Sequence, residues 1–303
     1  MARIIKNKKF LALAVFFIIS LFYVFNNNSL ISKKNVHELE KQTIEDFGNQ
    51  WNDLTDNQGY YASNELFQDI LGPNFKAAQL KDKIVIDIGA GSGRVTSMIY
   101  REGPAHIHSV EPAGKAFEVL KKNTEKFSNN ITYHNATGDK FQVHDADYAV
   151  SLGVIHHIPD PLPSMQNIYD SLKPGGEFVM WIYGYEGNEV YLSIFQPIRK
   201  ITTLMNDKIL HIFSKFLTYL LSGYIYLCDY FPLPMQDYML NHLKHFSWDD
   251  RYKTVFDQLN PAWAKYYKRS EAIELMEKVG FKEISIYHRH GYSWTVVGKK
   301  QAI

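Results

Sequence analysis

The feature that most constrains this chain is an apolar run that leads directly into a glycine-rich turn. Residues 85–88 have the pattern of a buried strand, glycines follow at positions 89, 91 and 93, and residues 95–101 predict a short helix. Glycine lets a ligand approach main-chain N–H groups closely, and the start of the following helix offers unsatisfied donors. The segment therefore predicts a nucleotide-cofactor site, with an ordinary tight strand-to-helix turn as the alternative.

The spacing of the glycines separates two classes of cofactor. A dinucleotide fingerprint needs Gly-x-Gly-x-x-Gly, and Arg94 stands where its third glycine would be, so a nicotinamide-dependent oxidoreductase is the weaker alternative. With an acidic residue inside the strand and Gly-x-Gly-x-Gly after it, the segment resembles the class I S-adenosylmethionine-dependent methyltransferases. The resemblance implies S-adenosyl-L-methionine as the cofactor, with a first set of binding residues at Asp87, Gly89, Ala90, Gly91 and Gly93.

The order of the downstream motifs strengthens the resemblance. Residues 106–110 predict a strand that ends at Glu111, where a carboxylate can accept both hydrogen bonds of a ribose diol; a solvated acid at a strand end is the alternative. Gly138 and Asp139 follow the next predicted strand, at 131–134. In the family this pair commonly lies beside the adenine, so the resemblance implies that Asp139 accepts from the exocyclic amine, although aspartate is also common in turns.

A third block begins as a buried strand at residue 147 and ends in two histidines. Ligands of open parallel sheets bind outside the carboxyl ends of the strands, so we expect residues 151–157 to line the pocket. A histidine can take a proton from a hydroxyl or amine, and we expect this of His156 rather than His157, with a structural hydrogen bond as the alternative. The remaining predicted cofactor contacts here are Ser151, Leu152 and Gly153.

The residues predict no metal site. Adjacent histidines without a well-spaced third ligand are a weak signal, and the single cysteine, Cys228, excludes a cysteine-rich zinc site.

The resemblance also implies a fold and a domain organisation. We expect a Rossmann-like, doubly wound sheet of seven mostly parallel strands with one antiparallel strand, in a methyltransferase domain over residues 41–303. Its parts are a cofactor core at 80–183, a helical cap insertion at 184–268, and a closing helix and hairpin at 269–300, with Ser270 capping the helix. We expect the cap, which follows the strand end facing the pocket, to select the substrate.

Each of two segments outside the core allows two interpretations. The aromatic stretch at 42–61 either closes over the cofactor or packs on the core. The apolar stretch at 212–231 favours helices packed as a cap over a surface that faces a membrane or a hydrophobic substrate.

The N-terminal part of the sequence predicts a membrane anchor helix. A basic tail at 1–9 precedes an apolar segment at 10–25, and a linker at 26–40 follows. Because no small-residue cleavage pattern follows the apolar segment, an uncleaved anchor is favoured over a removed signal peptide. The basic residues before it slightly outnumber those after it, which by itself would place the catalytic domain outside the cell. Because the cofactor is made in the cytosol, we leave the side open and prefer the cytosolic one.

The charge of the chain and its expected chemistry limit the classes of partner. The formal net charge is +1 and no concentrated basic face is visible, so we expect no nucleic-acid partner. A small-molecule or lipid-linked methyl acceptor at the membrane is expected, and the sequence does not indicate the oligomeric state. A membrane scaffold that keeps the cofactor fold without turnover is a further alternative.

Overall fold

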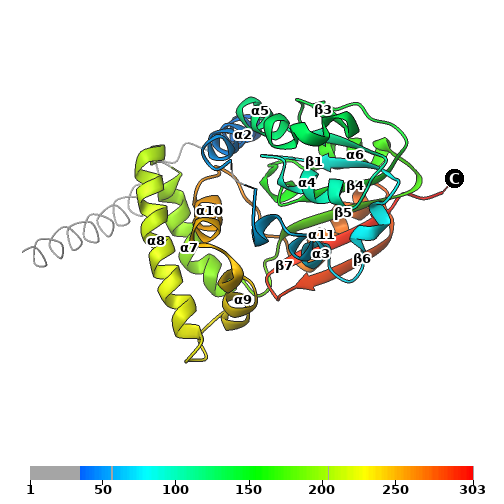
Figure 1. Ribbon diagram of the computed structural model, residues 1–303. Helices are drawn as coiled ribbons and strands as arrows, with labels where there is room; N and C mark the ends of the chain where they lie inside the picture. Colours follow the sequence, from blue (N-terminus) through cyan, green and yellow to red (C-terminus); the bar gives the residue numbers. More distant parts are fainter. Residues whose placement is uncertain (1–34, 56, 204, 303) are drawn as a thin grey trace, which may run out of the picture.

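A single mixed sheet forms the centre of the molecule (Figure 1). The computed structural model describes residues 35–55, 57–203 and 205–302. Within them, the strand order is β3-β2-β1-β4-β5-β7-β6, and β7 alone runs in the opposite direction to the other strands. This confirms the predicted seven-stranded, mostly parallel arrangement. The strands are β1 Ile84–Ile88, β2 His106–Val110, β3 Ile131–His134, β4 Ala146–Leu152, β5 Leu172–Tyr183, β6 Lys282–Arg289 and β7 Ser293–Lys299.

Helices cover both faces of the sheet, because alternate side chains of each central strand point to opposite faces. Val85 of β1 packs in the apolar cluster that contains helices α3 and α4, whereas Ile86 packs in the cluster that contains α6 and α11. Both residues are fully buried, which explains why β1 reads as a continuous apolar run. The helices are α3 Asn64–Leu71, α4 Arg94–Arg101, α5 Gly114–Thr124, α6 Leu162–Ser171 and α11 Arg269–Lys278.

A layer of helices lies beyond one end of the sheet (Figure 1). It occupies the segment where we expect the cap insertion, and it packs partly on itself, with α8 against α9 and α10. Its helices are α7 Glu189–Thr202, α8 Asp207–Cys228, α9 Gln236–Asn241 and α10 Trp248–Leu259.

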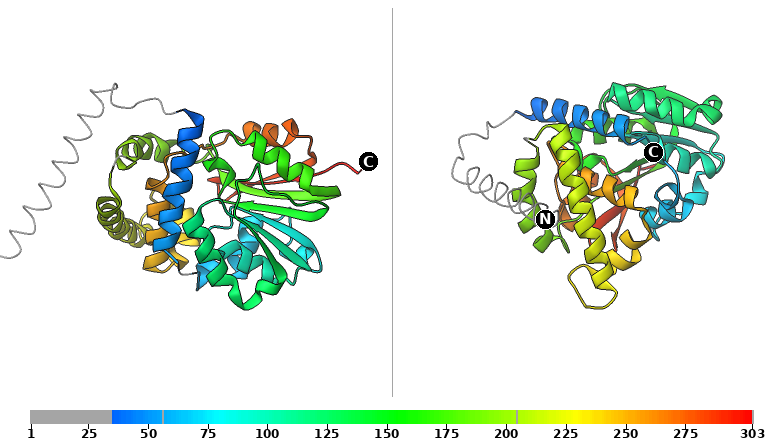
Figure 2. Two further views of the ribbon diagram at one scale, coloured as in Figure 1. Left: turned by 90° about the horizontal axis from the view of Figure 1, so that it is seen from above. Right: turned by 60° about the vertical axis from the view of Figure 1, so that its left-hand side comes forward.

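Helix α2, Val36–Asp53, lies between this cap and the sheet (Figure 2). Asn260, just after α10, donates to the carbonyl of Asp46 at 3.0 Å, and the amide of Ala262 donates to the Asp46 carboxylate at 2.9 Å. These bonds fix α2 against the cap.

One helix boundary differs from the sequence prediction. The closing helix α11 starts two residues earlier than predicted, because Lys268 rather than Ser270 occupies its N-cap and the Lys268 amide donates to the Glu271 carboxylate. The predicted anchor at 10–25 lies outside the described residues. None of the helices in the described ranges has both the length and the apolarity to cross a bilayer.

Candidate active site

The glycine turn after β1 aims its amides at the neighbouring strand ends. The amides of Gly89 and Ala90 donate to the carbonyl of Val110, at 2.8 and 3.0 Å, and the Gly91 amide donates to the Glu111 carboxylate at 2.8 Å. The turn therefore joins the ends of β1 and β2, which are adjacent parallel strands.

Space as well as backbone conformation requires glycine in this turn. Gly89 has φ +73°, and a Cβ atom there would lie 2.4 Å from Val154 Cγ2. Gly91 has φ +55°, and its Cβ would lie 3.1 Å from the indole nitrogen of Trp51. A side chain at position 89 would clash with the loop after β4, and one at 91 would push against α2.

Glu111 is a buried carboxylate with acceptor capacity to spare. Its other oxygen accepts from the Ala113 amide at 2.8 Å, so the two protein hydrogen bonds use two of about four acceptor positions on the group. Burial raises the pKa of Glu111 to about 7, although both backbone hydrogen bonds lower it. A ribose diol would supply the further donors that such a buried group needs, so the site fits an adenosyl group.

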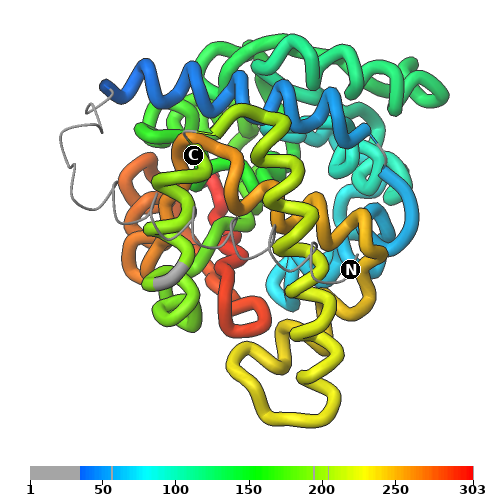
Figure 3. Tube along the Cα trace, turned by 90° about the vertical axis from the view of Figure 1, so that its left-hand side faces the viewer, coloured from blue at the N-terminus to red at the C-terminus, as the bar shows by residue number. Residues whose placement is uncertain are grey.

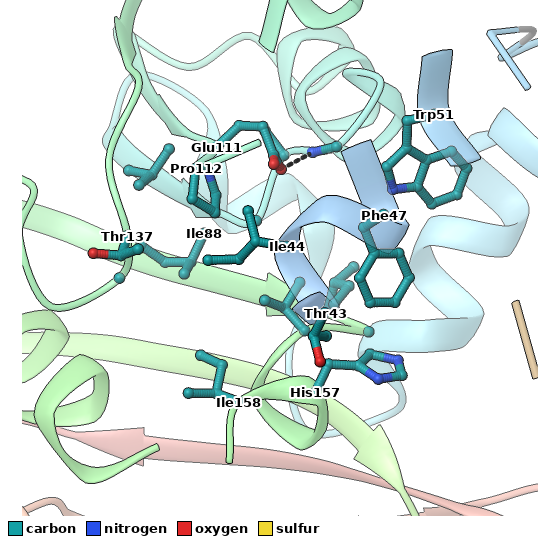
Figure 4. A pocket seen from close by; sticks show the side chains of 18 of the residues that line it. Thr43, Ile44, Phe47, Trp51, Ile88, Glu111, Pro112, Thr137, His157 and Ile158 are labelled. Carbon is teal, nitrogen blue, oxygen red and sulfur yellow. Dashed lines mark hydrogen bonds between the residues drawn. The ribbon is translucent and has the colours of Figure 1, made fainter. Parts of the chain in front are cut away.

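A cavity opens beside the glycine turn and Glu111, at the carboxyl ends of the central strands (Figure 4). Helix α2 covers it with Thr43, Ile44, Phe47 and Trp51, and one carboxylate, Asp257, comes from cap helix α10. Of the predicted cofactor residues, the lining contains Gly89, Ala90, Gly91, Glu111, Leu152 and Gly153.

Three predicted cofactor residues lie behind the cavity rather than in its wall. Asp87 is fully buried and accepts from the hydroxyl of Thr96 at 2.6 Å, which ties β1 to α4, and burial raises its pKa to about 7. Ser151 donates to the carbonyl of Ile88 at 3.4 Å. Gly93 precedes α4 with φ +85°. Ser151, which we expected to line the cavity, does not line it. The cofactor contacts predicted for Asp87 and Gly93 stay predictions.

Asp139 is exposed and does not line the cavity; its neighbours Thr137 and Gly138 do. The placement does not support the adenine contact that the resemblance implied for Asp139. Of the two neighbours that do line the cavity, Thr137 has a buried hydroxyl without a protein hydrogen-bond partner. The turn at 137–140 directs the aspartate outward, a direction that sequence position alone does not specify.

The two histidines exchange their expected places. His157 lines the cavity, whereas His156 does not; it is fully buried against Tyr183, with ring centroids 3.8 Å apart, and neither of its ring nitrogens has a partner. Burial and the neighbouring His157 hold the pKa of His156 well below its usual value. The prediction of His156 as the contact residue is therefore not supported, because the 3-10 turn after β4 points its neighbour into the cavity.

Sequence reasoning missed the residue that the cap contributes to the cavity wall, Asp257. Asp257 accepts from the amide group of Gln50 at 3.0 Å and from the hydroxyl of Tyr183 at 2.8 Å, so α2, α10 and β5 together orient it. No local motif surrounds Asp257, and only its neighbours in space reveal it. The described residues contain no group of His, Cys, Asp and Glu side chains suited to a metal ion.

Comparison with known proteins supports the chemistry of the core. Residues 86–180 match the family model of a methyltransferase domain. The ubiquinone biosynthesis O-methyltransferase of Nitrosospira multiformis is 25% identical over 152 residues, which are 49% of this chain and 61% of that protein. The tRNA U34 carboxymethyltransferase of Helicobacter acinonychis is 31% identical over 109 residues, 34% of this chain and 42% of the relative. The chain thus spans less than two thirds of these relatives.

A solved structure supports the fold. It is a complex between the Haloferax volcanii Trm112 methyltransferase activator and a methyltransferase, and the match has a TM-score of 0.50 at 12% identity, covering 86% of this chain and 98% of that one. The matched segment 86–180 contains the glycine turn, Glu111 and His157. The chain therefore carries a domain of the class I S-adenosylmethionine-dependent methyltransferases, whose cofactor is S-adenosyl-L-methionine.

Proposed function

We propose that this protein transfers a methyl group from S-adenosyl-L-methionine to a hydroxyl or amine of a small-molecule or lipid-linked acceptor at a membrane. The observation that carries the proposal is the buried Glu111 carboxylate, clamped by the amides of Gly91 and Ala113 at the wall of a cavity under α2. When bound, the cofactor supplies a methyl group already activated by its sulfonium. Alignment of donor and acceptor then accounts for most of the catalysis.

His157 is the proposed proton acceptor for a nucleophile that must lose a proton. Its Nδ1 lies 2.9 Å from the carbonyl of Trp263, and a carbonyl only accepts, so Nδ1 carries the hydrogen and Nε2 carries a lone pair. Burial lowers the pKa of His157 to about 4, so the ring is neutral at physiological pH. Phe47 contacts this ring edge-on, with centroids 4.7 Å apart, and limits its movement.

The charge of the chain and the names of its relatives both bear on the nature of the acceptor. The net charge of +1 favours a small or lipid-linked molecule over RNA, because phosphate backbones are bound by concentrated positive charge. Some curated relatives carry the name tRNA U34 carboxymethyltransferase, so total tRNA belongs among the acceptors to be tested. We further propose that residues 10–25 anchor the chain with its catalytic domain facing the cytosol, where the cofactor is made.

Calorimetric titration with S-adenosylhomocysteine tests the donor site. Replacing Gly91 with Trp should abolish measurable binding, because even a Cβ at this position meets Trp51 at 3.1 Å. Glu111→Ala should weaken binding by about tenfold or more, as expected when hydrogen bonds to a charged group are lost. Matched controls are Gly223→Trp, where a Cβ meets nothing within 4 Å, and Glu118→Ala on the exposed side of α5.

Equal affinity in the parent and in both site variants would refute the assignment. Tight binding without methyl transfer to lipid extracts, soluble extracts or tRNA would instead favour the scaffold alternative.

A further inference from the structure

Helix α8 carries large apolar side chains on its outer side as well as on the side that it buries. Its buried residues are Leu210, Ser214, Thr218, Ile225 and Cys228, and the Thr218 hydroxyl donates to the Ser214 carbonyl within the helix. Other large apolar side chains face outward. The exposed ones in and just after α8 are Ile209, Ile212, Tyr219, Leu220, Tyr226, Leu227, Tyr230 and Phe231.

The six of these residues that belong to α8 itself form one continuous surface, which we call the α8 outer face. At 3.6 residues per turn, positions 212, 219 and 226 lie along one line of the helix, and positions 209, 220 and 227 lie along the adjacent line. Ile212 is 68% exposed and Tyr226 is 61% exposed. The helix lies on the outside of the cap, with no described element in front of it (Figure 3).

Two lysines belong to the same surface. Lys208 and Lys215 are exposed, and their positions fall on the same side of the helix as Ile212 and Tyr219. Contiguous exposed apolar patches mark interaction sites, and lysine is depleted in the cores of protein–protein interfaces. Apolar and aromatic side chains bordered by lysine are instead the pattern of a helix that lies in the surface of an anionic bilayer.

We propose that the α8 outer face rests in the headgroup–acyl boundary of an anionic membrane. The sequence upstream supports this occupant. In the sequence, residues 10–25 are apolar except for Ser20, as expected of a lipid-embedded segment. Residues 26–35 separate this segment from α2 by at most about 35 Å when fully extended. An anchored chain therefore holds the cap close to the bilayer. The inference does not depend on the chemistry in the cavity.

Site-directed spin labelling of the full chain tests the proposal. A nitroxide is attached at Ile212→Cys or Tyr226→Cys, and the control label is placed at Glu118→Cys, exposed on α5. Cys228 is buried, so the unlabelled parent chain should take up no reagent under native conditions. Collisions with dioxygen and with a water-soluble nickel chelate are measured in vesicles of phosphatidylcholine and phosphatidylglycerol, and S-adenosylhomocysteine binding verifies that each variant is folded.

On vesicles, the labels at 212 and 226 should lose collisions with the nickel chelate and gain collisions with dioxygen, while the label at 118 should not change. Labels at both positions that stay open to the chelate on bound vesicles would overturn the proposal. Labels that are already protected from the chelate without vesicles would also overturn the proposal. If that protection does not change with protein concentration, residues 10–25 cover the α8 outer face. If it increases with protein concentration, a second copy of the chain covers it.

Discussion

His156 and His157 are adjacent in the chain but lie in different surroundings. His157 faces the cavity with Nδ1 held by the Trp263 carbonyl, whereas His156 is enclosed by aromatic rings and makes no side-chain hydrogen bond in the described part of the structure. A pair of histidines in a sequence can thus contain one candidate base and one packing residue.

Replacing each histidine separately should distinguish these roles. We expect His157→Asn to lower methyl transfer by about a hundredfold, the usual scale of general-base catalysis, with unchanged affinity for S-adenosylhomocysteine. His156→Asn should chiefly lower stability. Transfer of labelled methyl into an acceptor extract at saturating cofactor measures the first effect, and urea unfolding measures the second. In the parent, activity should decline only as the pH falls toward 4, where His157 gains its proton. Equal losses of transfer in both variants would contradict the assignment.

The buried carboxyl of Asp87 should make stability depend on pH. Its pKa rises from 3.8 to about 7 on folding, so the native state binds more protons than the unfolded state in this interval. The free energy of unfolding should therefore fall as the pH rises from about 4 to 7, by about 1.4 kcal/mol per pKa unit at most.

Asp87→Asn keeps a hydrogen-bond acceptor for the Thr96 hydroxyl and removes the titrating carboxyl. The decrease in the free energy of unfolding between pH 4 and 7 should then be about half as large, because Glu111, whose pKa burial also raises, still contributes to it. Urea unfolding across the interval measures it, with Glu118→Gln as a surface control. A slope identical to that of the parent would show that Asp87 does not titrate there.

Residue chemistry also explains what the sequence could predict about the site. Gly89, Gly91 and Glu111 stand at fixed spacing along one strand–turn–helix–strand unit, because a bound nucleotide demands amides and a carboxylate there. The direction of Asp139 and the choice between two histidines depend on single turns. Sequence spacing carries no information about those turns.

Helices α2 and α10 meet through a network of buried amides and a carboxylate. Gln50 of α2 donates to Asp257, and it accepts from Asn260 just after α10, at 3.1 Å. Gln50 is 1% exposed. Because buried polar groups that lose a partner are costly, the network holds α2 over the cavity in one orientation.

A double-mutant cycle should reveal this coupling. Gln50→Ala and Asp257→Ala should each lower the free energy of unfolding by about 2 kcal/mol, and the double variant should lose about 1 kcal/mol less than their sum. Urea unfolding measures all three. The exposed pair Glu45→Ala and Asp249→Ala, on the same two helices, should be additive. Additive losses at positions 50 and 257 would mean that the contact contributes nothing specific.

At this scale, strand and helix identities were predictable, but their ends were not. The closing helix begins after Lys268 rather than Ser270, because the Glu271 carboxylate accepts from the Lys268 amide and so caps the first turn. Which of several polar residues caps a helix depends on the path of the preceding chain. In α11 that path is set by Tyr267, which is buried and bonded to Tyr183.

The whole molecule combines a predictable core with less predictable additions. The alternation of short strands and helices over residues 80–183 leaves few ways to wind a parallel sheet, and the structure has the expected one. The positions of α2 and the cap depend on contacts between distant segments, such as residues 46 and 260, and no local periodicity encodes them.

The cavity wall is built from three pieces of chain: α2, the turns of the core, and α10. The segment shared with the family, residues 86–180, supplies only the middle piece. We expect the outer pieces to choose the acceptor, so that donor recognition and acceptor choice would be encoded in separate stretches of the gene. Evolution can rewrite the outer stretches for a new acceptor while the inherited centre continues to recognise the same donor.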